Sequence, residues 1–510
     1  MIRDTFRKLA ALSLCALFFA ACDERDEHFT GAGDKETQNV TVGEFLSASS
    51  DYRYFADLLD KHGYLDSISG ARPVTLLVPP KAEIEALAGS VMEDSMKNVL
   101  AYHIGNTLLY RSQMGTGKDQ YLKTFYNGKN IWTGKVSGET LSFDRDKMSM
   151  GKPVFCTNGV VHIIDGAMTP QTSLFENIQR KGDDFSKYKA EVLKDTLLFD
   201  KDNSFPIGVD KWGRTVYDSA FVLGYAFLDE KGDLSDENER YSNIVLSDAA
   251  IQATYDGLVQ RYYGSSENLP EYFEEDEEFV ENIYNQILYS TVLDIETENR
   301  KLGDTLEVTN GFFRRGELVR AKLLVTQEWL DHSPTKMSNG LAYELPKVDL
   351  LMSHVMGRPV SYDASQFSYF TAGLLGDVTP ELGEGGFPTE DPAREPVSND
   401  ALGITALHFS SKKPFWVEYR LPASMGGHFD LTISGLKNST SKAAVYVNGE
   451  LIDARFSPSG NWNTDNLKGV RTSGFGEKVV RFEVTEFNEE DDEKVYELGL
   501  NAIGFFPVAE

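Results

Sequence analysis

Three short segments, found in a fixed order between residues 75 and 164, constrain the fold of this chain more than any other feature. Residues 75–78 form an apolar run that stops at two prolines, which is typical of a short buried strand. Residues 100–103 end in Tyr102-His103 and continue an apolar pattern with three- and four-residue spacing, which favours a helix. The pair Asn158-Gly159 is a turn signal directly before an apolar run, which predicts a second buried strand.

The sequence around these segments predicts helices first and strands later. Apolar residues with helical spacing mark helices near residues 42–59 and 84–102. Between residues 121 and 155, short apolar stretches are separated by Asn-Gly, Thr-Gly and Ser-Gly pairs, which favour strands joined by turns. We therefore predict an α+β domain over residues 41–170.

The order and spacing of these segments resemble the fasciclin domain, a family of extracellular adhesion and binding modules. The resemblance implies an α+β fold with a wedge-like sheet, and a role in binding. It rests on Tyr102 and His103 in one segment and on Asn158, Gly159 and His162 in another. It implies that these five residues build the fold, although the Tyr-His region of some fasciclin proteins has been linked to receptor adhesion. A metal or acid–base role for the two histidines would require further groups that converge on them.

Residues 171–355 repeat the same order of segments in a degenerate form. Residues 242–248 resemble the strand at 75–78, and Tyr289 stands where Tyr102 stands. The interval from the tyrosine to the Asn-Gly pair is 56 residues in the first copy and 50 residues in the second, where the pair begins at Asn339. We therefore predict a second, degenerate fasciclin-like domain in which both histidines are replaced.

Two details of this second copy are also predicted. The pair Leu174-Phe175 aligns with Phe45-Leu46 of the first copy, which places the opening helix of the repeat. Residues between 255 and 281 form an insertion with an acid-rich run at 271–278, which favours a solvated loop over a metal site.

The last part of the chain shows alternating strand patterns. Residues 356–400 are predicted to be a linker and a first strand, because residues 383–400 are rich in Gly, Pro, Glu and Asp. Residues 401–510 are predicted to be a β-sandwich, because short strands alternate there with turn signals. The predicted strands are 415–420, 429–433, 443–449, 479–484 and 502–506. The pattern resembles galactose-binding-like jelly rolls, the fold of many carbohydrate-binding modules, and this resemblance implies glycan binding.

The first residues are predicted to be a lipoprotein signal peptide, residues 1–21, and not a part of the fold. Basic residues precede an apolar run at 9–19, which is too short to span a bilayer. Ala20-Ala21-Cys22 resembles a bacterial lipobox, which implies that Cys22 is acylated; an ordinary secretory signal cut nearby is the alternative. Four acids follow within residues 23–27, like the tracts that direct some lipoproteins to the outside of Gram-negative cells. We expect residues 22–40 to be a flexible acidic tether, and the protein to be anchored in the outer membrane and to face the cell exterior.

Cysteine content and charge restrict the partners of this chain. Of its three cysteines, Cys15 is lost with the signal and Cys22 carries the lipid, so Cys156 has no intrachain partner and a disulfide framework is excluded. The formal net charge is −29, and removal of the signal, which carries +2, leaves about −31. Nucleic acid and anionic lipid surfaces would be repelled by such a chain.

No pattern in the sequence supports catalysis. Gly-x-Ser-x-Gly, His-Glu-x-x-His, Cys-x-x-Cys and a phosphate loop are all absent from the sequence. A calcium loop beginning at Asp200 fails, because Phe205 stands where Gly is needed and Lys211 where Glu is needed. We predict no catalytic residue, no metal site and no cofactor.

Trp462 is the strongest candidate for a ligand-binding residue. It lies with Asn463 in a polar, turn-rich loop, where an aromatic ring gains little from burial unless it packs back on the sandwich. Sugars are held by aromatic faces with Asn or Asp bonding the hydroxyls, and Tyr446 is a weaker candidate of the same kind. The alternative for Trp462 is a packing role at the sandwich edge.

These observations predict a non-catalytic surface lipoprotein that binds an extracellular ligand, most simply a glycan, beside an outer-membrane nutrient-uptake complex. An adhesin or structural spacer, which contacts proteins or matrix through its fasciclin domains, is the alternative. A divergent hydrolase would require a cleft with two facing carboxylates.

Overall fold

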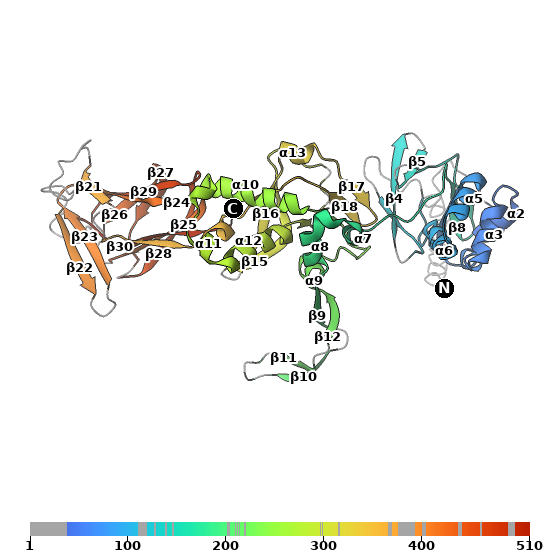
Figure 1. Cartoon of the computed structure of the whole chain (residues 1–510), viewed down its shortest axis with the longest axis horizontal. Coiled ribbons are helices and arrows are strands. Elements are labelled where there is room, and N and C mark those ends of the chain that lie inside the picture. The colour runs from blue at the N-terminus through green and yellow to red at the C-terminus, as the bar shows by residue number, and fades with distance from the viewer. Residues whose placement is uncertain are drawn as a thin grey trace, which may run out of the picture. The chain divides into compact units, whose positions relative to one another are not determined.

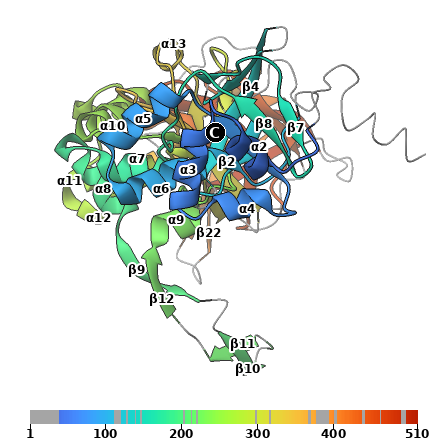
Figure 2. The same ribbon diagram turned by 90° about the vertical axis from the view of Figure 1, so that its right-hand side faces the viewer.

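The computed structural model describes residues 38–509 with internal gaps. The gaps are 111–119, 127–128, 138–139, 145–146, 201–203, 210, 212, 214, 219–220, 296, 298, 315–316, 366–369, 376–392, 400–403, 437–440, 460–461 and 488–494. The chain divides into two compact units. The first contains Met1–Arg180, Asp233–Tyr241 and Thr335–Leu341, and the second contains Lys181–Gly232, Ser242–Pro334 and Ala342–Glu510. Figures 1 and 2 show the helices and strands from two directions.

The centre of the first unit is a mixed four-stranded sheet with the strand order β2-β1-β8-β7. β1 (Val74–Val78) and β8 (Gly159–Ile163) lie parallel, and β2 (Ile104–Gly105) and β7 (Val154–Cys156) pair antiparallel with them at the two edges. Every residue of β1 is buried. Both faces of the strand are therefore covered, which is why its sequence is a continuous apolar run without alternation.

Alternate residues of β1 face two separate cores. Leu76 and Val78 pack with the helices, whereas Leu77 packs with Tyr102 and a second sheet. The helices are α2 (Val42–Ala48), α3 (Arg53–Lys61), α4 (Leu65–Ser69), α5 (Lys81–Ser90) and α6 (Glu93–Tyr102). The second sheet has the order β3 (Gln120–Lys123), β4 (Asn130–Ser137), β5 (Thr140–Phe143) and β6 (Lys147–Met148). The α+β domain predicted for this part of the chain is confirmed.

The side chain of Asn158 connects the opening helix to the closing strand. Its Oδ1 accepts a 2.8 Å bond from the N–H of Val42, and its Nδ2 donates to the carbonyl oxygens of Ile68 and Gly70. Gly159 follows, and a Cβ there would collide with the Val74 carbonyl and with Val42. The Asn-Gly pair is therefore required by hydrogen bonding and by close packing.

The second copy repeats this arrangement. Oδ1 of Asn339 accepts from the N–H of Leu174 at 2.9 Å, and its Nδ2 donates to the Leu234 and Asp236 carbonyls. A Cβ at Gly340 would likewise collide with a strand carbonyl, that of Tyr241. The order of the sheet, β14 (Val292–Leu293), β13 (Tyr241–Ile244), β18 (Gly340–Tyr343) and β17 (Thr335–Met337), is also the same, so the predicted duplication is confirmed.

The predicted alignment of the opening helices is wrong by one helical turn. Thr41 and Glu44 form a capping box before α2, with the backbone N–H of each bonded to the side chain of the other. Ser173 and Glu176 form the same box before α7, so Leu174 corresponds to Val42 and not to Phe45. The prediction failed because an amphipathic helix shifted by one turn shows a similar apolar pattern.

The remaining elements of the second copy follow the first with two insertions. Its helices are α7 (Leu174–Arg180), α8 (Ser186–Val192), α9 (Ala226–Lys231), α10 (Asp248–Tyr263), α11 (Tyr272–Glu275), α12 (Glu277–Tyr289), α13 (Gln327–Leu330) and α14 (Ser353–Met356), with 3-10 turns at Asp183–Phe185 and Ser266–Asn268. Its strands are β13 (Tyr241–Ile244), β14 (Val292–Leu293), β15 (Thr305–Arg314), β16 (Glu317–Leu324), β17 (Thr335–Met337), β18 (Gly340–Tyr343) and β19 (Asp349–Leu351). The acid-rich run at 271–278, predicted as a loop, lies on α11 and α12, because Asp276 caps α12 and acids suit a helix N-terminus.

The other insertion, which the sequence analysis missed, is a β-arm at residues 195–225 between α8 and α9. β9 (Asp195–Phe199) pairs with β12 (Phe221–Tyr225), and β10 (Phe205–Val209) pairs with β11 (Thr215–Asp218). The arm runs away from α8 and α9 in both views (Figures 1 and 2). Its exposed apolar side chains, between 40% and 72% accessible, are Leu197, Ile207, Val209, Val216, Phe221, Val222 and Leu223.

The C-terminal part is a sandwich of two antiparallel sheets. One has the order β22-β23-β30-β25-β28, with β20 also paired to β30, and the other has the order β21-β24-β29-β26-β27. Its strands are β20 (Val360–Asp363), β21 (Phe370–Leu374), β22 (Ala393–Asn399), β23 (Ile404–Ser411), β24 (Phe415–Ser424), β25 (Gly427–Gly435), β26 (Lys442–Val447), β27 (Glu450–Phe456), β28 (Thr464–Thr472), β29 (Gly476–Glu486) and β30 (Tyr496–Pro507). Four of the five predicted strands lie within one of these, and the fifth, 443–449, runs past the end of β26 into the turn at Asn448-Gly449. Three strands precede residue 400, where one was predicted. Two of them, β20 and β21, pair with strands distant in sequence, β30 and β24, whereas β22 pairs with the next strand, β23.

The repeated asparagine gives a test of the fold. Asn339→Ala removes three hydrogen bonds and leaves buried backbone groups without partners, so we expect the free energy of unfolding to fall by roughly 2–4 kcal/mol. Urea denaturation followed by circular dichroism measures the change. Asn466→Ala, at an exposed position on β28, is the matched control. Equal stability of the two variants would contradict the role assigned to Asn339.

Candidate functional site

The Tyr-His pair at the end of α6 lies inside the first unit. The hydroxyl of Tyr102 lies 3.0 Å from the Asn130 carbonyl oxygen and 2.9 Å from Oδ2 of Asp144, and the ring is buried. Burial, together with the Asp144 carboxylate, raises the pKa of Tyr102 well above its usual value. A proton held so tightly is not available for acid–base chemistry near neutral pH.

His103 is held in one neutral tautomer. Its Nδ1 lies 2.8 Å from the Val99 carbonyl oxygen and donates to it, and its Nε2 accepts from the N–H of Met168 at 3.1 Å. Burial lowers the pKa of His103 to about 4. A second proton on Nε2 would break the hydrogen bond from the Met168 N–H. This loss also disfavours the protonated ring and therefore lowers the pKa of His103.

His162 has a different set of neighbours. It is buried on β8, its Nε2 lies 3.2 Å from the Leu109 carbonyl oxygen, and its ring lies 5.5 Å from that of Phe143. The two histidines therefore bind different backbone groups. In the part of the chain that the structure describes, no three His, Cys, Asp or Glu side chains are placed to hold a metal ion. The contacts described above are all made with other residues of the first unit. This holds for Tyr102, His103, Asn158, Gly159 and His162.

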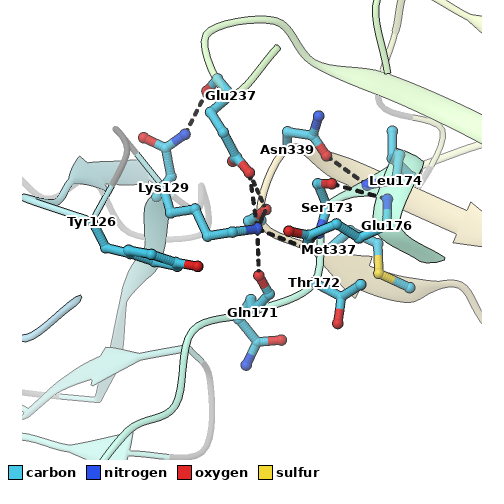
Figure 3. A network of polar contacts seen from close by, with 12 residues as sticks. Tyr126, Lys129, Gln171, Thr172, Ser173, Leu174, Glu176, Glu237, Met337 and Asn339 are labelled. Atoms are coloured by element: carbon cyan, nitrogen blue, oxygen red, sulfur yellow. Dashed lines mark hydrogen bonds and ion pairs between the residues drawn. The ribbon is translucent and has the colours of Figure 1, made fainter. Parts of the chain in front are cut away.

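A buried charged cluster of the first unit surrounds Lys129 (Figure 3). Its side chain is 7% exposed, and its Nζ lies 2.9 Å from Oε2 of Glu176 and 3.1 Å from Oε1 of Glu237. It also donates to the Gln171 carbonyl at 2.9 Å and lies 3.4 Å from the Ser338 hydroxyl, which itself donates to Glu237 at 2.8 Å. The ammonium is enclosed by protein oxygens, so this cluster is a structural connection between segments of the two copies.

The residues predicted to bind a ligand do not meet at one site. Trp462 and Asn463 lie on the loop between β27 and β28, next to the end of β25, where the Trp462 N–H donates to the Gly435 carbonyl at 2.8 Å. Tyr446 lies on β26 in the other sheet, opposite Arg481 of β29. Arg481 covers Trp416 at 4.5 Å and bonds to Glu483, so Tyr446 adjoins a set of paired charges.

Trp462 has an unusual backbone conformation. Its φ of 64° is in the left-handed region, which costs a bulky residue about 1–2 kcal/mol, and its indole is only half-buried. Strain of this kind is concentrated at functional positions, so Trp462 stays a candidate. Gly460 and Asn461 of the same loop lie outside the described residues.

A better enclosed site lies in the second unit, at a pocket of about 310 Å³. One wall of the pocket is buried and contains Tyr263, Met425 and Phe429. Tyr263 belongs to the last turn of α10, which stops at Gly264 in the left-handed conformation. Half-exposed rings surround this buried wall. They are those of Tyr272 from α11, Tyr362 from β20 and Phe475 before β29. The volume is at the lower end of the range for small-molecule sites.

Three polar side chains line the same pocket. Arg358 is bonded to Asp276, and its guanidinium lies 4.7 Å from the centre of the Tyr272 ring. Asn268 donates from Nδ2 to the Tyr263 carbonyl at 2.8 Å, which leaves its Oδ1 as an acceptor. Ser424 lies at the end of β24, in contact with a buried lysine described below. Aromatic walls with a few polar groups are the usual composition of a small-molecule site.

The sequence analysis did not find this pocket. Its residues come from the end of α10, the insertion after it, the region of β20, and strands and loops of the sandwich. They span 212 positions, from Tyr263 to Phe475. The aromatic residues between 262 and 273 were a usable signal of a binding site. The acid-rich run beside them instead favoured a solvated loop. No local pattern shows which of these rings share a cavity.

Other predictions have their own outcomes. Cys22 and the rest of residues 1–37 lie outside the described residues. Cys156 is a free, half-buried thiol whose pKa is raised to about 11 by burial. None of the described helices is long and apolar enough to cross a membrane.

A family model matches part of the first unit. Residues 50–170 match the family model of the fasciclin domain. A FAS1 domain pair from the insect cell adhesion molecule Fasciclin I is 15% identical, covers 60% of this chain and 98% of its own, and has a TM-score of 0.24. No curated protein matches the chain.

Two carbohydrate-binding modules are also similar to part of this chain. A family 35 module from Clostridium thermocellum is 12% identical, and the match covers 30% of this chain and 100% of the module, with a TM-score of 0.20. The C-terminal CBM6 of LamC from Zobellia galactanivorans is 14% identical, and the match covers 29% of this chain and 99% of that module, with a TM-score of 0.19. The element order and the family match confirm the predicted class, two α+β fasciclin-type domains followed by an all-β sandwich.

The buried histidine predicts a pH-dependent stability. Because the folded state holds the pKa of His103 near 4 and the unfolded state near 6.5, the unfolded chain binds more protons between these values. We therefore expect the stability contributed by neutral His103 to be lost as pH falls from 6.5 through 4, by up to about 3 kcal/mol. Urea denaturation of the wild type and His103→Gln at pH 7, 5.5 and 4.5 measures it. His62→Gln is the control, and a pH-independent difference between wild type and His103→Gln would contradict the assignment.

The Lys129 cluster predicts a large effect of one substitution. Lys129→Met leaves two carboxylates facing each other without a cation, so we expect a loss of about 3 kcal/mol or more in the free energy of unfolding. Adding Glu237→Gln to that variant should restore part of the loss, because it removes one of the stranded charges. Urea denaturation of both variants is the measurement, and no recovery in the double variant would argue against charge as the cause.

Proposed function

We propose that this protein is a non-catalytic binding protein of the cell exterior that holds an extracellular glycan in the aromatic pocket of its second unit. The observation that carries the proposal is the ring of half-exposed aromatics, Tyr272, Tyr362 and Phe475, above a buried apolar wall. Flat rings of this kind stack on the apolar faces of sugars, while neighbouring polar groups bond the hydroxyls. Asn268, Ser424 and Arg358 supply such groups here.

The cellular setting is a further part of the proposal. The signal at residues 1–21 and the lipobox-like Cys22 support a lipid anchor in the outer membrane, with the acidic segment after Cys22 as a tether that faces the exterior. A glycan-binding protein in that position would suit an accessory of a nutrient-uptake complex. The absence of any catalytic motif in the sequence supports a binding role without turnover.

The adhesin alternative has one observation in its favour. Among its described residues, the β-arm of the second copy exposes seven apolar side chains, and exposed apolar surface of this kind is common where proteins contact each other. An adhesin would bind protein or matrix and would show no retention by glycans. The experiment below therefore separates the two functions.

A glycan array followed by affinity electrophoresis tests the proposal. Phe475→Ala should weaken retention by the best glycan about tenfold, the effect of losing ~1.4 kcal/mol of stacking and burial. Phe475 lies on a loop, so we expect the melting temperature to stay nearly unchanged. Phe487→Ala, at another half-exposed phenylalanine outside the pocket, is the matched control.

A second variant separates the pocket from the loop predicted by sequence. If Trp462→Ala abolishes retention while Phe475→Ala has no effect, the glycan binds at the β27–β28 loop and the pocket is wrongly assigned. If the wild type is retained by no glycan, the proposed function itself is wrong and the adhesin alternative gains.

A further inference from the structure

Lys478 is a buried cation directly behind the aromatic pocket. It lies on β29, is 2% exposed, and its ammonium lies 5.4 Å and 5.8 Å from the ring centres of Phe429 and Phe505. Buried charges are normally paired with an opposite charge, because removal from water is costly. The two rings offset part of that cost through cation–π attraction.

The hydrogen bonds of Lys478 go to neutral oxygens. Its Nζ donates to the carbonyl oxygens of Ser424 and Met425 at 3.2 Å and 2.7 Å, and to the Ser424 hydroxyl at 2.7 Å. These three bonds use all three donors of the ammonium. In the described part of the chain no carboxylate forms an ion pair with it, in contrast to Lys129, which has two. Burial lowers the pKa of Lys478 to about 8, so the group is still mostly charged at neutral pH.

Ser424 brings this charge to the pocket. Both Ser424 and Met425, which bind the ammonium, line the cavity. The Ser424 oxygen accepts from Lys478, so its own O–H is left to donate elsewhere. A hydroxyl whose oxygen already accepts from a cation is a stronger donor, because the bonds of a chain polarise one another. This wall of the pocket therefore presents a donor backed by positive charge.

The other charges at the pocket cancel. Arg358 is paired with Asp276, the residue that also caps α12, and it lies over the Tyr272 and Phe279 rings. Asn268 is neutral. Among the described side chains that line the pocket or bond to its lining, the charge without an ion-pair partner is therefore that of Lys478, and it is positive.

From this arrangement we infer that the pocket binds an acidic sugar, with the ring against the aromatic side chains and its anionic group at Ser424. The inference rests on the proposed function and specifies the substrate class of the same site. A neutral sugar would satisfy the aromatic walls but would leave the buried ammonium without a counter-charge. A carboxylate, as in a uronic acid, or a sulfate ester would supply one.

Calorimetric titration with matched ligands tests the inference. Methyl glucuronide and methyl glucoside differ at one carbon, where the first carries a carboxylate and the second a hydroxymethyl group. We expect the wild type to bind the acid at least about tenfold more tightly, a difference of ~1.4 kcal/mol. Glucose 6-sulfate, titrated in parallel, distinguishes a carboxylate-specific site from one that accepts either anion.

Two variants locate the source of the preference. Ser424→Ala removes the donor with little change in volume and should reduce the preference for the acid to about threefold or less. Ser361→Ala, on the strand β20 between two residues that line the pocket, is the matched control and should retain it. Lys478→Met should abolish the preference; if that variant does not fold, the Ser424→Ala result decides alone.

The outcomes separate the inference from the proposed function. Equal binding of glucuronide and glucoside by the wild type would overturn the acidic-sugar inference and leave glycan binding intact. Full preference in Ser424→Ala would also overturn it, because the charge would then act from another place. Failure of every sugar to bind, with no glycan retained in electrophoresis, would remove the proposed function itself.

Discussion

The side-chain amide of Asn158 is the interaction on which the fasciclin-type fold of this chain depends. One amide accepts from the first N–H of the opening helix and donates to two carbonyls at the end of α4, while its own backbone leads into the central strand β8. Helix, loop and strand are thus fixed by a single planar group that uses both its acceptor and its donors. Asn339 makes the same three bonds in the second copy, although both motif histidines are gone. The amide is therefore a stricter requirement than the histidines.

Sequence alone predicts the parts of this structure that are encoded locally. The Asn-Gly pair, its spacing from the tyrosine and the apolar strands are short-range patterns, so both copies and five strands of the sandwich were found. The one-turn error at Leu174 shows where such patterns stop, since only the bonds to Asn339 and the Ser173–Glu176 box fix the register. The pocket could not be predicted, because Tyr263, Tyr272, Tyr362 and Phe475 meet only through the tertiary fold.

Two buried lysines show how the same side chain serves different ends. Lys129 is surrounded by Glu176, Glu237, the Gln171 carbonyl and the Ser338 hydroxyl, and its charge is neutralised inside the protein. Lys478 is held by neutral oxygens and aromatic rings, so its field extends toward the neighbouring cavity. Burial without a carboxylate destabilises the folded chain. The loss of stability from burying Lys478 has a functional reason if an anionic ligand supplies the missing negative charge.

The β-arm has a consequence for how this chain could have evolved. Asp195 and Tyr225, its first and last residues, are paired neighbours across two strands, so the insertion leaves and rejoins the body at nearly the same point. The first copy spans the corresponding place with the short turn His62-Gly63-Tyr64 between α3 and α4. For a segment whose ends lie together, the entropic cost of closure grows only slowly with its length. The arm is thus a module that could be gained, exchanged or lost in one event, while the fold that carries it is left unchanged.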